Sequence, residues 1–503
     1  MDLAQSFLQA DVDWHALAPE LVMTATACIV LVVDLFVPRS IKWVAMPIAA
    51  AGIVATLAAV VSLIGKDSLS LAGSFEVNSF ALMFKALFCV LGLALLGMSF
   101  DFFREGRYYQ GEYYFLLLCA LLGGMVMASA RDLISIFIAI ELISIPGVIM
   151  TALRKGDAKS NESALKFFLF SVLSSAVMLY GMSLVYGMTG HTQLHAIRAS
   201  MAFDGLASGA AAHPNLLIGN EAAMTMAIFF IVVGFAFKIS AVPFHFWAPD
   251  TYEGAPSPVA AFLSTASKIG GFVGLLVLMF VAFPDVADEW RPMFAVLAAA
   301  TMTVGNLIAL RQQHIIRLLA YSGIAQAGYI LVAFALIDPS NAGNLNDQAF
   351  RSALIYIAIY GVMDIGAFAA AISFARRGGT YFIDDYKGLW QRNPLLAALL
   401  AAFLVSLAGV PPVAGFWAKF FVFLATIQAE VYWLALVMGV NAVISAWYYL
   451  AVVKRMFFDP AEIEEPVEVP FILKATMGVA AAVLIGLLPA MPLLTNLVES
   501  SLL

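Results

Sequence analysis

Charged residues are scarce in this chain. Asp, Glu, Lys and Arg together make up 12% of its 503 residues, whereas hydrophobic residues make up 63%. Soluble domains usually hold about 25% charged residues, so this composition excludes an ordinary soluble protein and predicts a polytopic membrane protein. The few charges sum to −7, and this acidic balance gives no reason to expect nucleic acid as a partner.

Cysteine is also rare. The three cysteines, Cys28, Cys89 and Cys119, lie far apart in apolar runs and form no CxxC pair. This spacing argues against an iron–sulfur cluster or a zinc site. We interpret all three as small buried hydrophobic residues.

Nucleotide-binding and targeting motifs are missing as well. The sequence contains no GxxxxGK[ST] run and no GxGxxG after a predicted strand, so the chain itself is not expected to bind ATP or NADH. Residues 1–20 hold no Lys or Arg, unlike the basic start of a cleaved signal peptide. His191, His195 and His213 share a loop without the ligand spacing of a metal site, so no metal is expected there.

Long apolar runs, by contrast, fill the sequence. A membrane-spanning helix needs about 20 largely apolar residues, and this rule gives about fourteen candidate spans. They are 20–37, 42–64, 78–100, 113–129, 132–152, 163–188, 222–242, 258–283, 292–310, 315–337, 351–375, 394–427, 431–457 and 470–497. The run 394–427 is too long for one span and contains Pro411-Pro412, which predicts a helix broken in mid-membrane. The run that holds Lys238 is similarly interrupted at Pro243.

Basic residues are distributed unevenly between the predicted loops. If the N-terminus lies outside, about seventeen of the 26 Lys and Arg fall in inward segments and about five in outward segments. Basic residues favour the cytoplasmic side, so both termini are predicted to be periplasmic. The longest outer loop is expected at about 189–221.

Four charged side chains lie deep inside apolar runs: Glu141, Lys238, Lys268 and Lys419. A charge at the bilayer centre costs about 2.5–3.5 kcal/mol on insertion scales, so such residues usually face the protein interior or a water path. We predict that they are stations on a proton route. The alternative is that they form static contacts that hold helices together.

Each of the four has its own setting. Glu141 needs a partner from another helix, and Lys238 is the natural candidate. A nearby carboxylate favours the protonated lysine and burial favours the neutral one, so a change in their separation could load or release a proton. Lys268 has no acid in its span and lies among small residues that would admit water. Lys419 follows the diproline break, an arrangement expected at a gate.

Other residues are candidates for a supporting relay or gate: His245, Asp364, Pro243 and Pro411. His245 starts the acidic segment HFWAPDTYEGAPSP and could feed protons from the cytoplasm, or it could be an ordinary histidine at a helix end. That segment has no Lys or Arg, so we expect it to be tucked against the protein. Asp364 lies in mid-span, where a structural hydrogen bond is the favoured interpretation. Lys85 is expected to reach the membrane surface with its flexible side chain.

Several stretches of the sequence resemble one family. KISAVPFHFW and SLAGVPPVAGFWAKF both place a Val-Pro break and a Phe-Trp pair near a buried lysine. The longer stretch KISAVPFHFWAPDTYEGAPSPVAAFLSTASK, with HIIRLLAYSGIAQAGYIL and FIAIELISIPGVIM, resembles the antiporter-like membrane subunits of respiratory complex I. These are similar to Mrp-type sodium/proton antiporter subunits. The resemblance covers about residues 110–460.

The resemblance implies an all-α polytopic membrane fold with about 14 transmembrane helices, including two inverted five-helix repeats with broken helices. The expected divisions are a three-helix segment at 1–112, a first repeat at 113–283, a second repeat at 292–457 and a C-terminal helix at 458–503. It makes Glu141 and Lys238 the coupled pair, Lys268 the central relay and Lys419 the outlet-side residue.

The resemblance also implies what lies outside the chain. This chain would hold no cofactor, whereas FMN, iron–sulfur clusters and quinone would belong to other subunits. The expected partners are neighbouring antiporter-like subunits, the lateral helix of the largest one, and lipids of a bacterial inner membrane.

Local details favour the N-type branch of the family. GFWAKF carries Lys419 where the middle subunit looks to carry a glutamate, and IELISIP lacks a Trp that precedes the glutamate in the other two branches. Gln326 stands where a histidine is common, which weakens a relay role at that position. An Mrp-type cation/proton antiporter subunit is the alternative, and a structural spacer is a third hypothesis.

Overall fold

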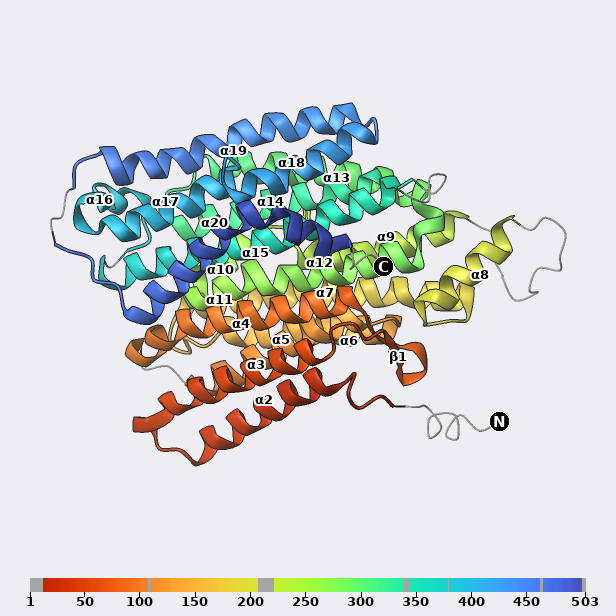
Figure 1. Ribbon diagram of the computed structural model, residues 1–503, viewed down its shortest axis with the longest axis horizontal. Coiled ribbons are helices and arrows are strands. Elements are labelled where there is room, and N and C mark those ends of the chain that lie inside the picture. The colour runs from red at the N-terminus through yellow and green to blue at the C-terminus, as the bar shows by residue number, and fades with distance from the viewer. Residues whose placement is uncertain are drawn as a thin grey trace.

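The structure is a computed structural model that describes residues 12–106, 110–206, 221–338, 344–378, 380–461 and 465–499. Almost all of these residues are helical, and the helices lie side by side along the long axis of Figure 1. The strands in these ranges, β1 (Ser68–Ser70) and β2 (Phe75–Val77), form an antiparallel hairpin at one end. Part of the predicted outer loop, residues 207–220 with His213, lies outside the described residues.

The first half of the chain contributes the helices at the lower and central levels of Figure 1. They are α2 (Ala18–Phe36), α3 (Ala45–Ser62), α4 (Ser79–Gly106), α5 (Gln110–Ser129), α6 (Leu133–Thr151), α7 (Ala158–Thr189), α8 (Leu194–Leu206), α9 (Glu221–Lys238), α10 (Trp247–Gly254), α11 (Ser257–Phe262) and α12 (Lys268–Val277). Two short π-helical turns, η3 (Leu263–Ser267) and η4 (Leu278–Ala282), make α11 and α12 one continuous rod.

The second half contributes the remaining long helices. They are α13 (Ala287–Ala309), α14 (Ile315–Val332), α15 (Asn344–Gly378), α16 (Leu389–Arg392), α17 (Pro394–Ala408), α18 (Ala414–Gln428), α19 (Tyr432–Phe458) and α20 (Phe471–Glu499). Short 3₁₀ turns connect or extend helices at η1 (Arg39–Val44), η2 (Leu71–Gly73), η5 (Pro284–Val286), η6 (Ala333–Leu336) and η7 (Ile383–Tyr386).

The prediction of an all-α polytopic fold is confirmed. Among the described residues, 11 helices are long and apolar enough to cross a membrane, or up to 12 if a bent pair counts as one span. The other predicted runs are shorter or interrupted: α9 has 18 residues, α17 and α18 have 15 each, and α20 bends by 72° between Leu487 and Pro489. The count of about fourteen crossings and the division into inverted repeats stay predictions.

Both predicted helix breaks are present. The chain leaves helical geometry after Lys238 and resumes at Trp247, and it does so again between Ala408 and Ala414. Proline cannot donate a backbone hydrogen bond, so prolines in these gaps stop the helices and free carbonyl groups before them. At the first break the Phe237 carbonyl accepts the Trp247 indole N–H at 3.1 Å and the Ser240 backbone N–H at 3.0 Å.

The centre of the molecule is formed by the α11–α12 rod, α14 and α15. In the most apolar stretch of each, 94% of the residues are buried in the α11–α12 rod, 94% in α14 and 89% in α15. The corresponding fraction is 33% in α2, α7 and α19. A helix that is buried on all sides cannot face lipid, so charged residues on these three helices must find their partners inside the protein.

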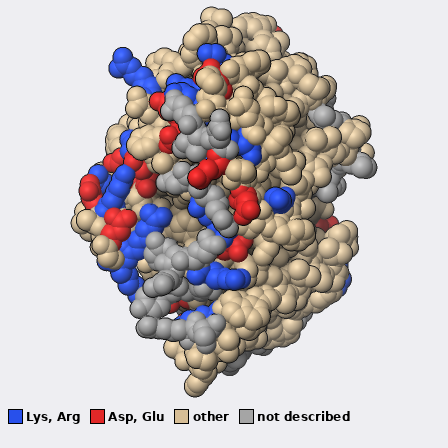
Figure 2. All heavy atoms as spheres, turned by 90° about the vertical axis from the view of Figure 1, so that its left-hand side faces the viewer, with Lys and Arg blue, Asp and Glu red and all other residues tan. Residues whose placement is uncertain are grey.

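One end of the molecule gathers most of the charges, and Figure 2 looks onto it. We call it the charged end; it is made by the connections α2–α3, α4–α5, α6–α7, α10–α11, α13–α14, α15–α17 and α19–α20. Ion pairs there join different connections: Lys155–Glu112, Lys159–Glu253, Arg317–Asp250, Arg376–Asp101 and Arg455–Asp384. The basic residues that the sequence assigns to the cytoplasmic side therefore lie together at one end of the molecule.

Candidate functional site

Glu141 and Lys238 enter the same polar cluster from different helices. The Asp132 carboxylate accepts the Ile134 N–H at 2.8 Å and starts α6, which places Glu141 about 12 Å further along the axis. The Lys238 ammonium, at the end of α9, donates to the Ser144 hydroxyl at 2.8 Å, one turn from Glu141. Ser175 of α7 donates to the Glu141 carboxylate.

The predicted pair is therefore close but not in direct contact. Among the described residues no ion pair joins Glu141 to Lys238, although their charges are near enough to interact. Lys238 donates to Ser144 and Glu141 accepts from Ser175, so each charged group has a hydroxyl partner of its own.

Lys268 lies at the start of α12, fully buried. Its ammonium has no hydrogen-bond partner among the described residues, and the Tyr252 ring is 5.9 Å away. The nearest acidic group is Asp364 of α15, whose charge interacts with Lys268. The Tyr360 hydroxyl lies between the two helices, 2.9 Å from the Ser264 carbonyl and 3.4 Å from an Asp364 carboxylate oxygen.

The acid that acts on Lys268 comes from another span. Asp364 lies on α15, about 100 residues away in sequence, and its charge interacts with that of Lys268 without a hydrogen bond to the Lys268 ammonium among the described residues. Helical periodicity within a span cannot tell which other spans touch it. Asp364 accepts a hydrogen bond from Tyr360, which agrees with the structural interpretation, and its charge also acts on Lys268.

Lys419 uses the second helix break. Its ammonium donates to the Ala408 carbonyl at 2.8 Å, one of the carbonyls that the end of α17 leaves free, and to Ser445 at 3.4 Å. It also lies 4.8 Å from the centre of the Tyr329 ring. No acidic partner within 4 Å appears among the described residues, so a neutral lysine would still keep one good hydrogen bond here.

The acidic segment after His245 is tucked against the protein, as predicted. Asp250 accepts from Lys166 and Arg317, and Glu253 accepts from Lys159 and Arg317. Burial alone would raise the pKa of Glu253, but the hydrogen bonds and charges of Lys159 and Arg317 outweigh it and lower that pKa below its usual value.

His245 itself is half-buried, and its Nδ1 atom has no hydrogen-bond partner among the described residues. It lies in the break that follows Lys238 and contains Pro243, and Pro411 lies in the matching break before Lys419. The expectation for Lys85 was wrong. That side chain is fully buried and forms an ion pair with Glu20 at 2.8 Å, because α2 packs against this part of the molecule.

The hydroxyl groups of the site were missed at the level of sequence. Ser144, Ser175 and Ser264 each contact or adjoin a charged residue, and Tyr360 links two helices. One signal was available: Ser144 follows Glu141 by three residues and so shares its helix face. The others lie on different helices, where sequence spacing carries no information.

Comparisons with known proteins show the family and the fold of this chain. Residues 130–445 match the family described as NADH:quinone oxidoreductase/Mrp antiporter, TM. A protein of Moorella thermoacetica named NADH-quinone oxidoreductase subunit N is 39% identical over 478 residues, which covers 94% of this chain and 96% of the relative.

Solved structures show the same architecture. A chain of respiratory complex I from Thermus thermophilus superimposes with a TM-score of 0.76 at 27% identity, covering 95% of this chain and 98% of that chain. A chain of the Mrp complex from Dietzia sp. gives a TM-score of 0.83 at 19% identity, covering 97% of each. At that identity the second match supports the fold alone.

Proposed function

This chain belongs to the membrane-subunit family that NADH:quinone oxidoreductases share with Mrp antiporters, and we propose that it is the N-type, proton-translocating subunit of a bacterial NADH:quinone oxidoreductase. The observation that carries the proposal is that Lys238, Lys268, Asp364 and Lys419 are all buried inside this apolar bundle, with Lys268 and Asp364 on its most buried helices. Static contacts alone would not require three lysines at membrane depth, each of them costly to bury.

We propose that protons move from the cytoplasm to the periplasm along these residues. Lys238 takes up a proton while the Glu141 carboxylate is near, because an opposite charge favours the ammonium form. When the two groups separate, Lys238 gives the proton through hydroxyl groups and water to a neutral Lys268, which Asp364 stabilises in its charged form. Lys268 passes it to Lys419, which releases it on the far side.

The driving energy would come from other subunits. In this proposal the chain holds no FMN, iron–sulfur cluster or quinone, and quinone reduction elsewhere reaches it as a change of charge and conformation. The partners would be neighbouring antiporter-like subunits, the lateral helix of the largest subunit, and lipids. The charged end would face the cytoplasm of a bacterial inner membrane, with both termini periplasmic.

Replacement of Lys238 by Ala tests the role of the buried lysines. We expect the complex to assemble and NADH-driven proton transfer to fall by roughly 10²-fold or more, the loss typical of a missing proton-transfer group. The measurements are NADH oxidation and vesicle acidification in membranes with the intact complex. Lys454→Ala, which changes an exposed basic residue at the charged end, is the control and should behave as wild type.

Two results would contradict this role. An assembled Lys238→Ala complex that transfers the wild-type number of protons per NADH would rule it out. Lys238→Met and Lys268→Met variants that assemble and pump normally would favour the structural-spacer hypothesis, because methionine keeps the bulk of the side chain without its charge.

An Mrp-type antiporter subunit is the second candidate, supported by the likeness to the Mrp complex fold. Native electrophoresis of mildly solubilised membranes separates the two. In an NADH:quinone oxidoreductase, the chain migrates in a large band that stains for NADH dehydrogenase activity. In an Mrp-type assembly, it migrates in a smaller, inactive band with other antiporter-like chains.

A further inference from the structure

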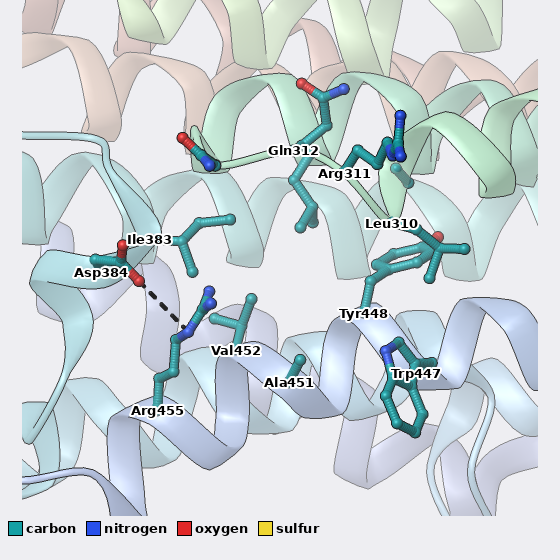
Figure 3. A pocket seen from close by; sticks show the side chains of 13 residues that line it. Leu310, Arg311, Gln312, Ile383, Asp384, Trp447, Tyr448, Ala451, Val452 and Arg455 are labelled. Carbon is teal, nitrogen blue, oxygen red and sulfur yellow. Dashed lines mark ion pairs between the residues drawn. The ribbon is translucent and has the colours of Figure 1, made fainter.

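A pocket of about 610 Å³ opens at the charged end, apart from the buried lysines described above. Its walls come from the α13–α14 connection, from η7 and from α19, as Figure 3 shows. Asp384 and Arg455 form an ion pair of 3.6 Å across it. A water molecule occupies about 30 Å³ in the liquid, so a pocket of this size with polar walls can hold many waters.

Tyr448 marks the inner wall of this pocket. In Figure 3 its ring lies beside Leu310, where α13 ends. Its hydroxyl donates to the Asn306 side-chain oxygen at 3.0 Å, and its ring lies 4.4 Å from the ring of the next residue, Tyr449. The phenol groups of these two tyrosines are close enough to interact. Tyr448 therefore lies between the pocket and a second, deeper phenol, that of Tyr449, which does not itself line the pocket.

From Tyr449 a string of buried polar groups continues inward. The Tyr449 hydroxyl is hydrogen-bonded to that of Ser322, and the Gln326 amide N–H donates to Tyr449 at 3.5 Å. All three side chains are at most 1% exposed. Tyr356 in turn donates to the Gln326 oxygen. None of these groups is charged, and the hydroxyls can each accept one proton while giving up another.

These hydrogen-bonded polar groups lie at depths between the charged end and the middle of the membrane. Ser322 and Gln326 lie about 10 and 16 Å from the start of α14, and 16 Å is about half the thickness of a bilayer core. Ser322 adjoins Gly323, and a Cβ atom at Gly323 would lie only 2.9 Å from the Lys268 Nζ atom. Ser322 is thus one residue from the glycine that packs against Lys268, although no hydrogen bond joins its hydroxyl to the Lys268 ammonium among the described residues.

We propose that this pocket is a second cytoplasmic vestibule, from which Tyr448, Tyr449 and Ser322 lead protons to Lys268. The inference rests on the proposed function and adds a proton supply that bypasses Lys238. In each step a hydroxyl oxygen accepts a proton from the pocket side and releases its own proton inward. The net result is one proton taken from pocket water and one gained by a neutral Lys268 amine, with every hydroxyl regenerated. Gln326 orients Tyr449 without changing its own protonation.

The first test removes the hydroxyl without changing the ring. Tyr449→Phe in the intact complex is expected to lower NADH-driven proton transfer about tenfold, less than the roughly 10²–10⁴-fold of a lost acid–base group because water can enter in its place. Tyr113→Phe is the matched control, since Tyr113 is also a fully buried phenol but lies on α5, away from the string. It should pump as wild type.

The second test fills the pocket and leaves the string intact. Ala451 lines the pocket, whereas the adjacent Leu450 is 44% exposed on the outer surface of α19. Ala451→Phe should slow proton transfer by a factor similar to that of Tyr449→Phe, and Leu450→Phe should not. A larger solvent deuterium isotope effect on turnover in Ala451→Phe than in wild type would support a proton-uptake step at the pocket.

The outcomes separate this inference from the proposed function. Suppose that Tyr449→Phe and Ala451→Phe both assemble and pump at the wild-type rate while Lys268→Met is inactive. Protons then do not enter through this pocket, and the proposed function stands. If Lys268→Met also pumps normally, both fail. If only Tyr449→Phe is slow and Ala451→Phe is unaffected, protons do not enter by this pocket, and the inference is again overturned.

Discussion

Each of the three lysines of the proposed proton route, Lys238, Lys268 and Lys419, lies against a glycine. A Cβ atom added at that glycine would come within hard contact of the lysine side chain, so the lysine stem occupies space that only glycine leaves open. The distances are 3.0 Å from Gly271 to Lys238 Cγ, 2.9 Å from Gly323 to Lys268 Nζ, and 2.8 Å from Gly409 to Lys419 Cδ. The position of each ammonium group thus depends on backbone approach as well as on charge.

Gly323→Ala tests this dependence at Lys268. The new methyl group would also lie 2.9 Å from the Tyr360 hydroxyl, so it must displace the lysine head, the phenol, or both. We expect proton transfer in the assembled complex to fall about tenfold, because a misplaced proton-transfer group loses much of its effect. Vesicle acidification driven by NADH oxidation measures it.

Gly439→Ala is the control for that substitution. Gly439 lies within α19, and nothing lies within 4 Å of the added Cβ. Alanine is favoured over glycine inside a helix by about 1 kcal/mol, so this variant should be at least as stable as wild type and equally active. Equal proton transfer in Gly323→Ala and Gly439→Ala would show that the close approach of Gly323 to Lys268 does not matter for function.

At the level of whole elements, the two broken helices show what sequence can and cannot predict. Pro243 and Pro411-Pro412 predicted the breaks because proline removes a backbone donor. The side chains that donate hydrogen bonds to carbonyls at the helix ends are different at the two sites. They are Trp247 at the first break and Lys419 at the second. Which side chain fills such a position depends on how the chain resumes after the break, and no local pattern contains that information.

Gly409→Ala tests the second break. Gly409 ends α17 with φ +82, a left-handed conformation that costs a non-glycine residue roughly 1–2 kcal/mol, and its Cβ would press on Lys419. Gly190 ends α7 with φ +71, but nothing lies within 4 Å of its Cβ. Both Gly→Ala variants should lose similar stability in a thermal melt of the purified complex, while only Gly409→Ala should lose proton transfer. Equal transfer in the two variants would contradict a role for Lys419.

At the scale of the molecule, the sequence predicted the class of fold and the depth of the charged residues, because both follow from hydropathy along the chain. It did not predict which helices form the centre. The nearness of Asp364 to Lys268, and the ion pair of Lys85 with Glu20, arise from the packing of helices far apart in sequence. The buried tyrosines around Gln326 were overlooked for the same reason, since aromatic residues are abundant in every apolar run.

The distribution of basic residues over the two ends of the molecule predicts its orientation in the membrane. The basic residues assigned to the inner side do gather at the charged end, whereas the β1–β2 hairpin and the α3 terminus lie at the opposite end of Figure 1. Translocation favours the more basic end inside, so the charged end should face the cytoplasm. Lys454 and Asp67 are exposed at opposite ends and can each be replaced by cysteine in a variant that lacks Cys28, Cys89 and Cys119.

A membrane-impermeant maleimide then reports the side of each position. In intact spheroplasts, Asp67→Cys should be labelled and Lys454→Cys should not, and after permeabilisation both should be labelled. The permeabilised sample controls for local accessibility. Labelling of Lys454→Cys alone in intact spheroplasts would reverse the orientation. The pocket between η7 and α19 would then open to the periplasm, and proton uptake from the cytoplasm could not begin there.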